Sequence, residues 1–174
     1  MRLDEVNALD DEEAARELRR CCGSTRWVQM MTAARPFADA GAMTAAGDAI
    51  WASLAPTDWL EAFASHPRIG ETRAGGAGGT GGADWSQQEQ AGAAAAADAT
   101  RLRLAEANRQ YEARFGYIFI VCATGRTAAE MLHLLEHRLR NAPGVELGVA
   151  AEEQRTIVRL RLAKLIGTEQ VTTT

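Results

Sequence analysis

Residues that could transfer protons or bind a ligand are concentrated between His66 and Gln90 of this 174-residue chain. His66 is followed at once by Pro67, which stops a helix, so we expect the histidine at a helix end. Its side chain titrates near neutrality and suits proton transfer, although a charged histidine can also simply cap the last carbonyls of a helix. Ser86, Glu89 and Gln90 follow at i, i+3 and i+4, a spacing that places hydrogen-bonding side chains on one helix face. These groups are typical of a small-molecule site.

The residues between these groups, 70–82, are too rich in glycine for regular structure, so we predict a loop. Residues 76–81 within this loop read GAGGTG, which matches the dinucleotide-binding fingerprint. That fingerprint requires a preceding strand within a strand–helix–strand unit. A helix and a proline precede it here, so no dinucleotide site is predicted.

Arg161 is predicted to lie on the inward face of the last helix. Ile157, Val158 and Leu165 occupy positions i−4, i−3 and i+4 around it. An arginine on an inward face usually holds an anion, either a carboxylate side chain or a ligand. Arg159 has polar or small residues in the equivalent places and is predicted to face outward.

His133, Glu136 and His137 match the inverted zinc-protease pattern on one helix. A mononuclear zinc site needs a further ligand. Leu132 and Leu135 define the apolar stripe of this helix, which leaves both histidines towards solvent. We therefore favour a polar outer face and predict no metal site.

The elements that must position these groups are predicted to be helices. Capping boxes, apolar repeats and prolines indicate helices over about residues 10–23, 24–35, 42–54, 57–66, 84–113, 127–141 and 146–166. Residues 117–122 form a short apolar run that we predict to be extended, and no second run exists to pair with it. The prediction is an all-α helical bundle in which residues 1–174 form a single domain.

The composition and charge of the chain argue against some classes of partner. The chain is 47% hydrophobic with a net charge of −4, as expected of a soluble globular protein. Its basic residues are scattered, which argues against nucleic acid and anionic membranes as partners. No apolar run reaches transmembrane length, and the first residues lack the apolar core of a signal peptide. The cysteines Cys21, Cys22 and Cys122 cannot all pair, so we expect reduced thiols and a cytoplasmic location.

Several short runs along the chain resemble one family in combination. They are HPRIG at 66–70, WS at 85–86, EQAG at 89–92, Asn108, Tyr111, RFG at 114–116, CATGR at 122–126, EML at 130–132 and RL at 161–162. This set resembles the 2-oxo-4-hydroxy-4-carboxy-5-ureidoimidazoline (OHCU) decarboxylase family, which catalyses the last step from urate to (S)-allantoin. One departure is Ile118, which follows Phe-Gly-Tyr where many members carry a proline after Phe-Gly-Phe.

The resemblance implies an all-α homodimeric enzyme that decarboxylates OHCU to (S)-allantoin without a metal or organic cofactor. It implies that His66 is the acid–base residue and that Glu89 and Arg161 complete the catalytic set. The substrate-binding residues that it implies are Pro67, Ser86, Gln90, Phe119, Ile120, Val121, Cys122 and Ala123.

Two other functions are compatible with parts of this pattern. In a non-catalytic helical binding module, His66 and Arg161 would only hold a ligand or each other. In a zinc hydrolase, His133 and His137 would bind the metal. Apposition of His66, Glu89 and Arg161 around one cavity favours the decarboxylase over the module, and metal analysis tests the hydrolase.

Overall fold

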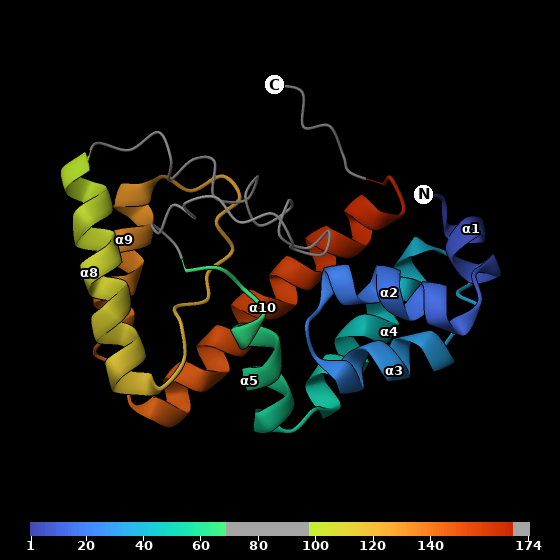
Figure 1. The fold of residues 1–174 in the computed structure, drawn as a ribbon, viewed down its shortest axis with the longest axis horizontal. Helices are drawn as coiled ribbons and strands as arrows, with labels where there is room; N and C mark the ends of the chain where they lie inside the picture. The colour runs from blue at the N-terminus through green and yellow to red at the C-terminus, as the bar shows by residue number, and fades with distance from the viewer. Residues whose placement is uncertain (69–97, 169–174) are drawn as a thin grey trace. The chain divides into compact units, whose positions relative to one another are not determined.

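The computed structural model describes residues 1–68 and 98–168, and this part of the chain is helical, with no strand (Figure 1). The all-α prediction is therefore confirmed. The helices are α1 (Leu3–Ala8), α2 (Asp11–Cys21), α3 (Thr25–Ala33), α4 (Ala40–Ser53), α5 (Pro56–Ala64), α8 (Asp98–Phe115), α9 (Ala128–Arg138) and α10 (Pro143–Leu165). Within the described ranges, none of these helices has the length and apolar character needed to cross a membrane.

The chain divides into two compact units. Unit 1 comprises Met1–Ala62 and Arg155–Thr174, and unit 2 comprises Phe63–Gln154. The division falls within α5 and within α10, so each of these helices contributes residues to both units.

Unit 1 is built from α1 to α4, most of α5 and the second part of α10. Ser24 caps α3 by accepting a hydrogen bond from the amide of Trp27 at 3.2 Å, as its sequence position predicts. The Trp27 ring is fully buried, and its indole nitrogen donates to the carbonyl of Gly47 on α4 at 3.1 Å. A Cβ atom at Gly47 would lie 3.2 Å from the Leu162 side chain. Glycine is therefore needed where α3, α4 and α10 meet.

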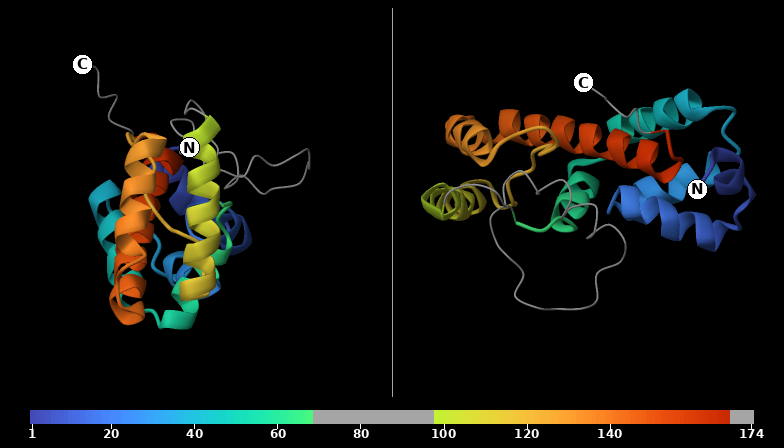
Figure 2. Two further views of the ribbon diagram at one scale, coloured as in Figure 1. Left: turned by 90° about the vertical axis from the view of Figure 1, so that its left-hand side faces the viewer. Right: turned by 90° about the horizontal axis from the view of Figure 1, so that it is seen from above.

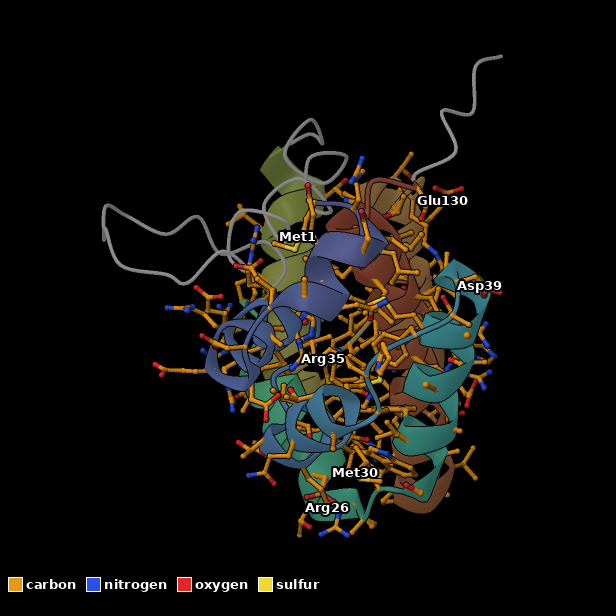
Figure 3. The ribbon with its side chains drawn as sticks, turned by 90° about the vertical axis from the view of Figure 1, so that its right-hand side faces the viewer. Met1, Arg26, Met30, Arg35, Asp39 and Glu130 are labelled. Carbon is orange, nitrogen blue, oxygen red and sulfur yellow. The ribbon has the colours of Figure 1, made fainter. Side chains whose placement is uncertain are left out.

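The short helix α1 was not predicted from sequence, and Arg35 attaches it to the rest of unit 1. The Arg35 guanidinium donates to the carbonyl oxygens of Val6 at 3.1 Å and Leu9 at 2.7 Å. It also pairs with the Asp11 carboxylate at 2.6 Å. In Figure 3 the labelled Arg35 lies among the unit 1 helices, whereas the labelled Met30 points outward; Met30 is 36% exposed.

Unit 2 is organised around α8 and α9, which lie side by side and run in the same direction (Figures 1 and 2). Two parallel helices need a connection that returns along their length, and residues 116–127 provide it. Thr127 and Glu130 form the capping box that starts α9, where the sequence predicts a helix to begin. The core of the unit comprises Leu104, Ala107, Tyr111, Phe119, Val121, Ala123, Ala128, Met131, Leu132 and Leu135.

Some helix boundaries differ from the predictions. The last helix begins at Pro143 and not near residue 146, because proline is favoured at the first helical position, where no amide donor is needed. Helix α9 ends at Arg138, three residues before the predicted end. The glycine-rich loop predicted at 70–82, and the part of a long helix predicted at 84–97, lie outside the described residues.

Candidate active site

His66 and Pro67 follow α5 directly and lie in unit 2. The backbone nitrogen of His66 donates to the carbonyl of Phe63 at 3.1 Å, which closes the turn after the helix, and the side chain is partly buried with its Nε2 atom inside. Two contacts bracket this turn. The Phe63 ring lies 5.4 Å from the Tyr117 ring, and the Arg68 guanidinium donates to the Glu112 carboxylate at 2.9 and 2.7 Å.

The Arg68–Glu112 pair is bidentate, which is the geometry that best fixes an arginine against a carboxylate. Its hydrogen bonds lower the pKa of Glu112, so the carboxylate stays ionised at neutral pH. These contacts connect the turn that carries His66 to α8 and to the start of the connection between α8 and α9.

Residues 119–123 of this connection are buried, and each is at most 7% exposed. They belong to neither helix nor strand, so their backbone groups lack the partners that regular structure would supply. The amide of Cys122 donates to Oε2 of Glu153 at 2.7 Å. The amides of Phe119, Val121 and Ala123 make no hydrogen bond to any residue in the described ranges. Buried amides without partners are costly, and a ligand acceptor would satisfy them.

A buried ionic network underlies this segment, and it was not predicted from the sequence. Arg138 pairs with Glu146 at 2.6 Å, with side-chain exposures of only 6% and 0%. Glu146 also accepts hydrogen bonds from the Tyr111 hydroxyl and from the side-chain amide nitrogen of Asn141, the latter at 2.7 Å. Arg138 donates in addition to the carbonyl of Ile120 at 2.7 Å. The signal that identified Arg161 also applied here, since Arg138 lies on the apolar face of its own helix.

Tyr111 is the donor that completes this network. Burial, together with the hydrogen bond to Glu146, raises the pKa of Tyr111, so the phenol keeps its proton and remains a donor. The network is thus a protonated phenol and a guanidinium on one carboxylate, which satisfies a charge that would otherwise be costly to bury.

Arg161 lies in unit 1 and is 3% exposed, which confirms the predicted inward face. Burial raises the pKa of the Cys21 thiol, and the positive charge of Arg161 opposes part of that rise, which places Arg161 near Cys21. Arg159 is exposed and donates from Nε to both carboxylate oxygens of Asp48 at 2.9 Å. The two arginines therefore differ in environment as the sequence predicts.

The remaining predicted residues are placed as follows. Pro67 and Phe119–Ala123 lie in unit 2 with His66, and Arg161 lies in unit 1. Ser86, Glu89 and Gln90 fall outside the described residues. His133 and His137 are both exposed, which confirms their solvent-facing orientation. Residues 1–68 and 98–168 contain no group of three or more metal-ligating side chains arranged around a common point.

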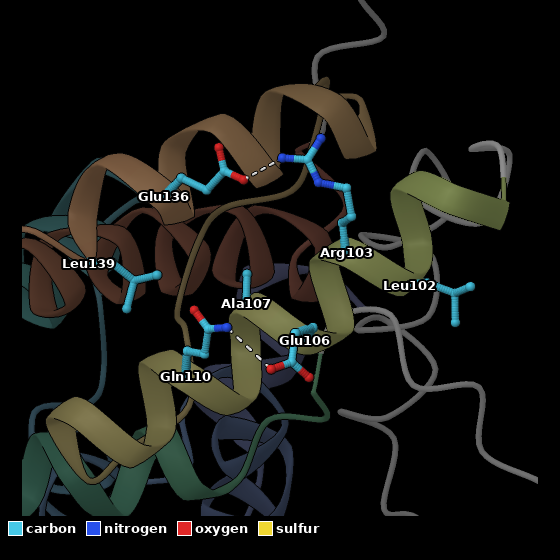
Figure 4. A pocket seen from close by; sticks show the side chains of 7 residues that line it. All are labelled: Leu102, Arg103, Glu106, Ala107, Gln110, Glu136 and Leu139. Carbon is cyan, nitrogen blue, oxygen red and sulfur yellow. Dashed lines mark hydrogen bonds and ion pairs between the residues drawn. The ribbon is translucent and has the colours of Figure 1, made fainter.

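An open groove of about 360 Å³ lies between α8 and α9 (Figure 4). Its polar side chains bond to one another: Arg103 pairs with Glu136 at 2.8 Å, and Gln110 donates to Glu106 at 3.2 Å. These groups are exposed and already partnered, so the groove offers nothing specific to a small molecule. The amides of Phe119, Val121 and Ala123, which make no hydrogen bond within the described ranges, identify the better candidate.

Gln154 on α10 is fully buried, and neither of its amide atoms has a hydrogen-bond partner in the described part of the chain. A buried polar group in this state costs about 1–3 kcal/mol. Gln154→Met keeps a similar length without the polar atoms, so it should raise the free energy of unfolding by roughly 1 kcal/mol or more. Urea unfolding measures this change. Gln110→Met, at an exposed position, is the control and should stay within about 0.5 kcal/mol of wild type. A less stable Gln154→Met protein would show that the amide is hydrogen-bonded in solution.

The described part of the chain is thus helical, with His66 and the 119–123 segment in unit 2 and the buried Arg161 in unit 1. The family model described as OHCU decarboxylase matches residues 7–163. The chain therefore belongs to the OHCU decarboxylase family.

Individual relatives agree with this assignment. The uric acid degradation bifunctional protein TTL of Arabidopsis thaliana is 45% identical over 152 residues, which cover 87% of this chain and 47% of the relative. The OHCU decarboxylase of Amia calva is 38% identical over 80 residues, 46% of each chain. The chain thus spans about half the length of these curated relatives. A crystal structure of OHCU decarboxylase in the presence of (S)-allantoin superposes with a TM-score of 0.76 at 40% identity, covering 87% of this chain and 98% of that one.

Proposed function

We propose that the protein decarboxylates OHCU to (S)-allantoin, the last step of urate degradation to allantoin. The observation that carries this proposal is the extent of the family match. It runs from residue 7 to residue 163 and so includes the His-Pro pair, the Ser-x-x-Glu-Gln run and the inward arginine together. The crystal structure at 40% identity, described as OHCU decarboxylase in the presence of (S)-allantoin, supports the same substrate class.

The proposed reaction needs no electron sink from a cofactor. The substrate carries a carboxylate and a hydroxyl on one ring carbon, beside an unsaturated ring position. When the bond to the carboxylate breaks, carbon dioxide leaves and the electron pair delocalises into the ring. The hydroxyl then loses its proton as its carbon becomes the ring carbonyl, and a proton is delivered to the carbon that bears the ureido arm. Delivery to one face gives the S product.

Each proposed residue has one role in this scheme. His66 transfers the proton at the hydroxyl or the ring carbon. Arg161 pairs with substrate carboxylate oxygens through its two-pronged guanidinium. Glu89, Ser86 and Gln90 hold the ureido and ring amides, and Pro67 lines the pocket. The backbone of Phe119–Ala123 offers amide donors to the ring carbonyl, which stabilises developing negative charge.

We further propose that residues 1–174 act as a single catalytic domain, in a homodimer located in the cytoplasm. The family match across most of the chain supports one functional domain. The net charge of −4 and scattered basic residues support a small-molecule substrate without nucleic-acid or membrane partners.

The activity test uses the purified protein and freshly generated substrate, made from urate by enzymes for the two preceding steps. Wild-type protein should speed decay of the intermediate and build optical activity well beyond the spontaneous, racemic reaction, as followed by circular dichroism. Turnover should survive exhaustive chelation, since the scheme uses no metal. A racemic product at an unchanged rate contradicts the proposed function, and loss of activity that zinc restores contradicts its cofactor independence.

A further inference from the structure

Two side chains hold one edge of the segment that runs from α8 to α9. Arg138 donates from Nη1 to the carbonyl oxygen of Ile120 at 2.7 Å, and Glu153 accepts from the amide of Cys122 at 2.7 Å. In the extended conformation that the sequence predicts for this segment, the N–H and C=O of residues i and i+2 point to the same side. The two contacts therefore occupy the same edge, as a neighbouring strand would in a sheet.

The opposite edge presents the amides of Phe119, Val121 and Ala123, because alternate residues point the other way. These amides make no hydrogen bond within the described ranges, although their residues are 2–6% exposed. The protein thus bonds one edge at the Ile120 carbonyl and the Cys122 amide, and the other edge carries a row of donors for an external acceptor.

Each of these two side chains has a further partner. The Arg138 guanidinium pairs with the fully buried Glu146 and lies 4.6 Å from the centroid of the Phe119 ring. Glu153 lies 3.6 Å from the Arg126 guanidinium at the far end of the segment. Arg138, which has several buried contacts, therefore holds the backbone at Ile120 more tightly than a mobile surface group would.

We infer that Arg138 and Glu153 are positioning residues of the decarboxylase, which orient the 119–123 segment so that the amides of Phe119, Val121 and Ala123 meet the substrate ring. This inference rests on the proposed function. Neither side chain acts on the substrate itself. Each acts through the backbone, so its loss should misdirect the amide donors and lower kcat/KM while the protein remains folded.

Glu153 gives the sharper test because it is partly exposed, and its replacement should leave the fold intact. Glu153→Met removes the acceptor for the Cys122 amide, whereas Glu153→Gln keeps an acceptor oxygen but loses the charge. We expect Glu153→Met to lower kcat/KM by about tenfold or more. We expect Glu153→Gln to recover to within about threefold of wild type, since the backbone bond is retained.

Arg138→Lys tests the other contact, the hydrogen bond from Arg138 to the Ile120 carbonyl. Lysine keeps a charge beside Glu146 but cannot bond the carboxylate and the Ile120 carbonyl in the same fork. It should lower kcat/KM by about tenfold or more. Arg140→Lys, at an exposed position just beyond α9, is the matched control and should behave as wild type. Helicity and thermal unfolding are measured on every variant, so that kinetic losses are read on folded protein.

The outcomes separate this inference from the proposed function. An active wild type with impaired Glu153→Met, recovered Glu153→Gln and impaired Arg138→Lys supports the inference. An active wild type with unchanged kinetics in folded Glu153→Met overturns it alone, even if Arg138→Lys fails to fold. Equal loss in Glu153→Met and Glu153→Gln also overturns it, because charge and not the backbone bond would then matter. An inactive wild type overturns the proposed function, and the inference falls with it.

Discussion

His66→Asn is expected to lower turnover by about a hundred- to ten-thousand-fold, the usual contribution of a positioned proton-transfer group. Asparagine keeps hydrogen-bonding capacity at this position but cannot exchange a proton near neutral pH. The fold should persist, since His66 lies in a turn after α5 and its backbone bond to Phe63 does not involve the side chain. Steady-state kinetics with circular dichroism measures both effects.

The control for this change is His133→Asn on the exposed face of α9, which should be nearly silent. A pH profile adds a second readout, because a rate limited by histidine protonation should lose that titration in His66→Asn. Near-normal turnover of the His66 variant would show that His66 caps the end of α5 and does not transfer the proton.

Arg161→Ala is expected to damage kcat/KM severely, whereas Arg159→Ala should stay close to wild type. Loss of one partner of a desolvated, hydrogen-bonded charge pair commonly costs about 2–5 kcal/mol, or roughly thirty- to several-thousand-fold. Arg161 is 3% exposed, which is the condition for such a cost. Arg161→Lys should rescue poorly, because lysine lacks the planar fork that binds two carboxylate oxygens.

Arg159 is a demanding control because it also has a bidentate carboxylate partner, Asp48. Its side chain is 46% exposed, and exposed pairs contribute only about 0.2–1 kcal/mol. The measurements are kcat/KM and helicity of Arg161→Ala, Arg161→Lys and Arg159→Ala. Equal damage from both alanine changes, or full rescue by lysine, would contradict a substrate clamp at Arg161.

Features of the fold that depend on nearby residues were predictable from the sequence. The caps at Asp10, Ser24 and Thr127 all form, because each bond joins a side chain to an amide three residues later. The inward face of Arg161 was equally predictable, since helical periodicity alone determines it. Helical periodicity also correctly predicted that His133 and His137 face solvent.

Features that depend on distant residues were not predictable in the same way. The Tyr111–Glu146 bond joins positions 35 residues apart, and no local pattern indicates it. The helix start at Pro143 was missed because a proline can either break a helix or occupy its first turn. The burial of Glu146 was missed because it depends on its ion pair with Arg138, which lies on another helix. The catalytic roles of His66, Glu89 and Arg161 remain predictions, which the variants above test.

The three cysteines give each compact unit its own chemical reporter. All three are buried and outside any disulfide, with Cys21 and Cys22 in unit 1 and Cys122 in unit 2. Burial raises the pKa of Cys22 to about 12, and that of Cys21 rises for the same reason. Because the thiolate is the reactive form, alkylation in native buffer requires a transient opening that exposes the sulfur. Labelling rates at the Cys21–Cys22 pair and at Cys122, read by peptide mass spectrometry, would therefore give the opening equilibrium of each unit separately in the unmodified chain.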